Sequence, residues 1–133
     1  MLTPPRPFVA LAGIALIEGV ALLGYGLFDA IEAIRVGATG PEDVSNGPAI
    51  ALQIVLFAIF GAGLVWIARG WWSARRWARA PFLLAQLLAL LVGYDISQGA
   101  GAERFAGVAL AIVAALGIVL VFTPAVMRQL DAE

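Results

Sequence analysis

Residues 105–127 read FAGVALAIVAALGIVLVFTPAVM, a stretch without a single charged side chain. The hydrocarbon core of a bilayer is about 30 Å thick, so a helix needs about 20 mostly apolar residues to cross it. Lipid offers the backbone no hydrogen bonds, and a crossing segment must therefore be a helix or part of a closed barrel. By length and composition, this stretch predicts a transmembrane segment.

Three further apolar stretches precede it, at residues 8–34, 48–68 and 81–96. Strands of a membrane barrel alternate between apolar and polar residues, whereas these stretches are continuously apolar, which favours helices. The whole chain is 62% hydrophobic and 13% charged, and a soluble domain is usually about 25% charged. We therefore expect an all-α fold, a bundle of four transmembrane helices that forms a single integral membrane domain over residues 1–133.

Several residue types that carry enzyme chemistry are missing. The chain has no cysteine and no histidine, and all eight of its basic residues are arginine. Without these types there is no disulfide, no imidazole base, no usual zinc site and no lysine for a Schiff base. Carboxylate chemistry remains open. We predict a protein with no enzymatic activity, no cofactor, no metal site and no nucleic-acid partner.

The distribution of arginine predicts the orientation in the membrane. Loops on the cytoplasmic side carry an excess of Arg and Lys. If there are four spans, one side of the membrane holds only Arg35 and Arg104, and the other side holds the remaining arginines. We therefore place both termini and the middle loop in the cytoplasm, in a multi-pass protein of the bacterial plasma (inner) membrane. The arginines of that side are Arg6, Arg69, Arg75, Arg76, Arg79 and Arg128.

The loop between the second and third stretches mixes these arginines with tryptophans, whose indoles favour the headgroup layer. We expect this segment to anchor the protein at the lipid headgroups, where its arginines can meet anionic lipids. Simple anchoring and a specific docking site for a lipid or a protein remain alternatives. The expected anchor residues are Arg69, Trp71, Trp72, Arg75, Arg76, Trp77 and Arg79.

Glu18 is the outstanding polar residue within an apolar stretch. It lies about ten residues into the first stretch, or about 15 Å deep, near the bilayer centre. An ionisable residue at that depth is costly and is a functional candidate by default. Its expected partner is Gln86, about 9 Å into the third stretch. Three interpretations stay open: a neutral acid with a structural hydrogen bond, a polar contact between helices or subunits, and a proton or cation site.

Other polar residues are expected near the opposite side of the membrane from the arginine loop. Glu32 and Arg35 are three residues apart and can pair on one helix face, and Gln53 is expected to hydrogen-bond to another helix. Arg35 and Arg104 can neutralise a group of carboxylates there. That group is either a salt-bridge network or a vestibule that attracts cations. Its members are Asp29, Glu32, Asp95 and Glu103.

Small residues recur at four-residue spacing along the apolar stretches. This spacing lets two membrane helices cross closely, and it predicts a tight bundle. The pairs are Ala15 and Gly19, Ala58 and Ala62, Ala89 and Gly93, and Gly107 and Ala111.

Two resemblances follow from these residues. Segment Leu11–Gly19, with its membrane glutamate, resembles the first span of small multidrug resistance transporters, but the long outer loop and the arginine loop depart from that family. Segment Arg75–Pro81, followed by Gln86 and a final stretch that ends in Thr-Pro, resembles small four-span membrane proteins of high-GC actinobacteria. That second resemblance covers most of the chain and implies no known activity.

The leading hypothesis for function is an accessory or scaffold protein that packs against itself or within a larger membrane complex. The alternative is a small proton- or cation-coupled transporter, a homodimer that uses Glu18. A third class, a membrane enzyme that acts on lipid through Glu18 or Asp95, has no motif to support it.

Overall fold

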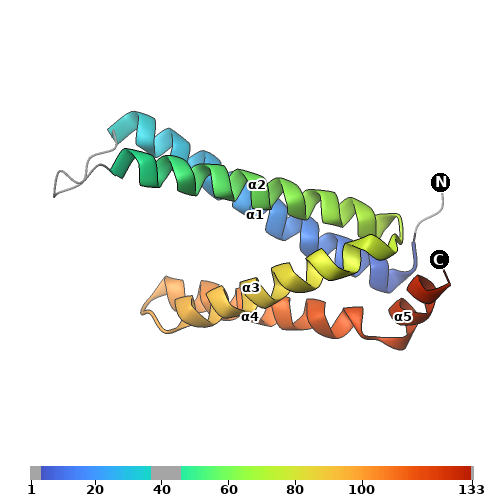
Figure 1. The fold of residues 1–133 in the computed structure, drawn as a ribbon. Helices are drawn as coiled ribbons and strands as arrows, with labels where there is room; N and C mark the ends of the chain where they lie inside the picture. The colour runs from blue at the N-terminus through green and yellow to red at the C-terminus, as the bar shows by residue number, and fades with distance from the viewer. Residues whose placement is uncertain (1–3, 37–45, 133) are drawn as a thin grey trace. The chain divides into compact units, whose positions relative to one another are not determined.

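The computed structural model describes residues 4–36 and 46–132, and the regular structure of these residues is entirely helical (Figure 1). Four helices are long and apolar enough to cross a membrane. The expectation of an all-α protein with four candidate spans is therefore confirmed. The elements are α1 (Arg6–Val36), α2 (Asn46–Trp72), the 3₁₀ turn η1 (Arg76–Ala78), α3 (Arg79–Ser97), α4 (Ala102–Val121) and α5 (Pro124–Asp131).

The chain divides into two compact units. The first, Leu16–Trp66, pairs most of α1 with most of α2 and is called the α1–α2 unit. The second, called the α3–α5 unit, combines α1 up to Ala15 with the chain from Ile67 onward.

Glycines bring the two helices of the α1–α2 unit into backbone contact. A Cβ atom placed on Gly19 would lie 2.8 Å from the carbonyl oxygen of Gly61. One placed on Gly26 would lie 3.2 Å from the Cβ of Phe57, whose ring meets Tyr25 edge-on with centroids 5.4 Å apart. Because side chains are absent at the crossing, the helices approach to a distance that alanine would not allow.

The α3–α4 hairpin is built on the same principle. A Cβ on Gly107 would lie 2.6 Å from the carbonyl oxygen of Gly93, and a Cβ on Gly93 would lie 2.8 Å from the backbone nitrogen of Ala111. The connecting turn ends at Gly101, whose φ of 72° and ψ of −146° suit glycine alone. Gly93, Gly107 and Ala111 belong to the small-residue pairs identified in the sequence, and they form a close helix crossing.

The helix boundaries differ from the expected spans by several residues, and two of the differences involve proline. Helix α3 begins at Arg79, so Pro81 lies in its first turn, where the missing N–H would have no helical partner. The stretch 105–127 is not one helix, because α4 ends at Val121 and α5 begins at Pro124. Thr123 is extended, and its hydroxyl donates a hydrogen bond of 2.7 Å to the carbonyl oxygen of Leu120. Proline cannot continue a helix without a clash with the preceding turn, which explains the break.

Helix α5 is short and amphipathic. Val126 and Leu130 are fully buried, and Arg128, Gln129 and Asp131 are exposed. The start of α1, the connection between α2 and α3, and helix α5 all lie at one end of the α3–α5 unit (Figure 1). That end is called the basic end below.

The crossing in the α1–α2 unit yields a first prediction. Gly19→Ala should lower the free energy of unfolding by about 1–3 kcal/mol, because the added methyl group meets backbone atoms of α2. Gly13→Ala, on the same helix, is the matched control, since nothing lies within 4 Å of its Cβ position. The control should be neutral or stabilising by up to about 1 kcal/mol. Reversible unfolding in mixed SDS micelles, followed by circular dichroism, measures both, and equal effects would contradict the close crossing.

Candidate functional site

The connection from α2 to α3 is a compact turn with a defined backbone conformation. Ala74 has a φ of 54°, the left-handed conformation that usually takes glycine after a helix. Its N–H donates to the carbonyl oxygen of Trp71 at 2.9 Å, and the N–H of Arg75 donates to that of Gly70 at 2.8 Å. These two bonds form a Schellman motif, which satisfies the last carbonyl groups of α2 and reverses the chain.

The ring of Trp77 packs against Gly70, near the end of α2. A Cβ on Gly70 would lie 2.8 Å from Cζ2 of the Trp77 ring and 2.9 Å from the Cβ of Ala78. Ala78 is fully buried, whereas Arg75 and Arg76 are exposed. The packing of Trp77 on Gly70 therefore leaves the two neighbouring arginines on the surface.

Trp71 belongs to the core rather than to the exposed surface. It is fully buried, and its ring lies 5.7 Å from that of Phe8 and 5.5 Å, edge-on, from that of Phe82. Within residues 4–36 and 46–132, its indole N–H is buried without a hydrogen-bond acceptor. This location departs from the expected role of Trp71 as an anchor in the headgroup layer. Trp72 and Trp77 are 44% and 43% exposed and can fill that role.

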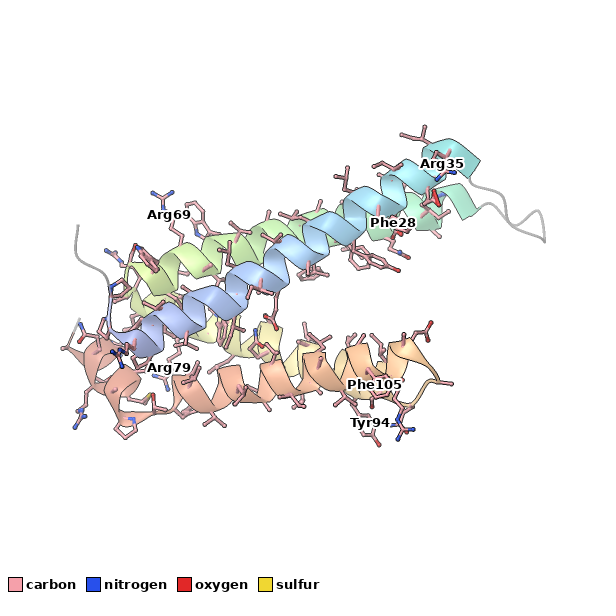
Figure 2. The ribbon with its side chains drawn as sticks, turned by 180° about the vertical axis from the view of Figure 1, so that it is seen from behind. Phe28, Arg35, Arg69, Arg79, Tyr94 and Phe105 are labelled. Carbon is pink, nitrogen blue, oxygen red and sulfur yellow. The ribbon has the colours of Figure 1, made fainter. Side chains whose placement is uncertain are left out.

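The arginines of the expected anchor are distributed around the same end. Arg69 is exposed and projects away from α2 (Figure 2). Arg79 is half-buried, and its guanidinium carbon lies 5.8 Å from the centroid of the Phe122 ring, within the range of a cation–π contact. Arg79 thus ties the start of α3 to the end of α4, while Arg69, Arg75 and Arg76 are directed toward the surroundings.

Glu18 and Gln86 lie in different units, and their pairing stays a prediction. Glu18 is half-buried next to the crossing residue Gly19, and its Oε2 atom is shielded from the surroundings. Gln86 is fully buried, and its Oε1 atom lies 3.4 Å from the Cβ position of Gly117 in α4. Gln86 therefore lies at a contact between α3 and α4, and both residues lie inside apolar segments, as the sequence predicts.

The expected acidic cluster is distributed over both units. In the α1–α2 unit, Gln53 donates a hydrogen bond of 2.6 Å to Asp29, which confirms Gln53 as a link between helices. Arg35 and Glu32 form an ion pair of 3.0 Å, as their spacing predicts (Figure 2).

The remaining members of that cluster belong to the α3–α5 unit. Asp95 lies near the end of α3 and Glu103 in the first turn of α4, and both are exposed. Whether all four carboxylates form one cluster stays a prediction. Among the described residues there is no group of three or more acidic side chains placed to hold a metal ion.

The comparisons with known proteins are sparse. No protein-family model matches the chain, and no solved structure matches it. Undecaprenyl-diphosphatase 3 of Frankia alni is 41% identical to this chain over 90 residues. The aligned part is 62% of this chain but 29% of that protein, so the chain spans less than a third of the length of the curated relative it matches. The name of the relative is that of an enzyme, which points away from our expectation of no enzymatic activity. The partial match does not assign the activity of the relative to this chain.

The aromatic cluster yields a second prediction. Trp71→Ala should cost about 3–5 kcal/mol of unfolding free energy, because it leaves a cavity between Phe8 and Phe82. Trp72→Ala, at the adjacent and partly exposed position, should cost about 1 kcal/mol or less. Thermal unfolding in detergent, monitored by circular dichroism, compares the two. A larger loss for Trp72→Ala would show that Trp71 is not the core residue.

Proposed function

We propose that this protein is a membrane-embedded packing subunit that associates with a second copy of itself through α1 and α2. One observation carries the proposal: within the α1–α2 unit, no described residue lies within 4 Å of the Cβ position of Gly24 or of Gly63. Glycine in a helix interior costs about 1 kcal/mol relative to alanine. At Gly19 and Gly61 a close crossing within the chain offsets that cost, and a contact with another helix would do the same at the open glycines.

The surroundings of the open glycines support such a contact. Val20 and Leu27, about one turn to either side of Gly24, are exposed. Ile59 and Trp66 flank Gly63 in the same way and are exposed as well. Each helix therefore presents a notch between two large apolar side chains. Membrane helices associate through van der Waals packing at such small residues, since lipid tails are as apolar as the side chains.

The third prediction tests this association. The chain has no cysteine, so Leu27→Cys introduces a single thiol beside Gly24. Oxidation in native membranes should give a crosslinked dimer, and adding Gly24→Leu and Gly63→Leu should reduce its yield several-fold because the bulk blocks helix approach. Ala109→Leu, at an exposed alanine of α4, adds the same kind of bulk and should leave the yield unchanged.

Two results would contradict the proposal. One is a wild-type chain that is monomeric at every ratio of protein to lipid, counted by single-molecule photobleaching. The other is a crosslinking yield that is insensitive to both glycine substitutions.

A membrane enzyme that acts on a lipid diphosphate is the second candidate, and the match to an undecaprenyl-diphosphatase favours it. Arginine side chains suit phosphate, and the α3–α5 unit carries several of them at its basic end. The sequence offers Glu18 as a carboxylate for this candidate, and Glu18 belongs to the other unit. Hydrolysis of undecaprenyl diphosphate would release inorganic phosphate. The transporter alternative uses the same carboxylate as a proton or cation site within the membrane.

The fourth prediction separates the three candidates with Glu18→Gln. A packing subunit should show neither phosphate release nor ion flux in proteoliposomes, and the substitution should leave its crosslinking unchanged. Phosphate release that is lost in Glu18→Gln would establish the enzyme instead. A proton or cation flux that is lost in the same variant would establish the transporter.

A further inference from the structure

The basic end of the α3–α5 unit carries an excess of one charge. Six arginines belong to it, and among the described residues the only carboxylate there is Asp131. Arg104 and the two carboxylates Asp95 and Glu103 belong to the opposite end, near the turn between α3 and α4. The six arginines are Arg6, Arg69, Arg75, Arg76, Arg79 and Arg128.

The local fold directs most of these charges outward. The left-handed residue Ala74 reverses the chain, and Trp77 packs on Gly70, so that Arg75 and Arg76 stay exposed on the turn. Arg69, in the last turn of α2, is exposed too and has a favourable interaction with the negative end of the helix dipole. The backbone that carries Arg75 and Arg76 is therefore fixed by the turn, and both side chains extend from it into an exposed region.

Apolar groups lie next to these charges. Trp72 and Trp77 are both less than half exposed, so each indole presents one edge to the surroundings. Helix α5 buries Val126 and Leu130 and exposes Arg128 and Gln129. The apolar face of α5 is therefore covered by the protein, and its polar face with Arg128 meets the surroundings.

We propose that the basic end binds the phosphate groups of anionic lipids. Arginine holds a phosphate through two parallel N–H···O bonds, which lysine cannot do, and every basic residue of this chain is arginine. The arginines lie at the end of membrane-spanning helices and beside indoles that favour the headgroup layer. Lipid phosphates are the anions found at that depth. This inference goes beyond the packing function and does not depend on it.

Tryptophan fluorescence tests the proposal, because all four tryptophans of the chain lie within residues 66–77. Quenching by brominated phosphatidylglycerol and by brominated phosphatidylcholine gives the relative affinity of the two lipids at this segment. The wild type should prefer phosphatidylglycerol at low salt, and the preference should weaken as NaCl screens the charges. In the double variant Arg75→Gln with Arg76→Gln, the ratio of the affinity for phosphatidylglycerol to that for phosphatidylcholine should fall about 30-fold. Each arginine near an anionic surface raises the affinity for anionic lipid roughly fivefold.

The matched control is the double variant Arg35→Gln with Arg104→Gln, which removes the same charge from the last turn of α1 and the first turn of α4. It should keep the wild-type preference. An equal loss in both variants, no loss in either, or a wild-type preference that salt leaves unchanged would overturn the proposal. Inorganic phosphate at 10-fold excess over lipid should not displace phosphatidylglycerol, and displacement would assign the site to free phosphate. The salt titration uses the wild type and so does not depend on the folding of any variant.

Discussion

The close approach of backbones at glycine is the constraint on which the described structure depends. Within a bilayer, burying apolar side chains between helices gains little, because the lipid is equally apolar. Helices then associate through the number of atoms in van der Waals contact, and that number rises when nothing separates the backbones. Gly19 with Gly61, and Gly93 with Gly107, provide such contacts in the two units. In each hairpin the two helices therefore approach most closely at their glycines.

Polar interactions gather at the ends of the helices, where water and headgroups are available. The bond from Gln53 to Asp29 and the ion pair of Glu32 with Arg35 both lie near the loop between α1 and α2. The Schellman motif at Ala74 satisfies the carbonyl groups that would otherwise be left at the end of α2. Two polar residues lie farther from the ends: Gln86 is fully buried against Gly117, and Glu18 is half-buried and precedes Gly19 in the sequence. This division explains how a chain with few charged residues can have both a stable membrane core and a strongly basic end.

The sequence predicted the four candidate spans and their helical type because the bilayer imposes the length and composition of a span, whereas the short helix α5 was not predicted. The sequence could not show which of two neighbouring residues of the same type is buried and which is exposed. Trp71 and Trp72 are adjacent, yet one is fully buried against Phe8 and Phe82, and the other is partly exposed. Apolar periodicity identifies the buried face of a soluble helix, but here both faces are apolar and the signal is lost.

The same loss of signal affects glycine and alanine. Gly19 lies at a crossing, whereas no described residue of the α1–α2 unit lies within 4 Å of the Cβ position of Gly24, although both glycines occur in similar sequence. Ala74 adopts a left-handed conformation that an alanine in the sequence does not predict. The effect of Pro124 on a helix is, by contrast, local and steric, and α4 ends three residues before it.

The most direct test of the whole description is the location of the two ends of α3 across the membrane. Ser73→Cys and Ala100→Cys each place one thiol at an exposed position in a chain that has no cysteine, one before α3 and one after it. A membrane-impermeant maleimide should label Ala100→Cys in intact cells and Ser73→Cys only in inverted vesicles. Labelling of both positions from the same side would contradict a membrane-spanning α3 and, with it, the predicted location of the basic end at the cytoplasmic headgroups.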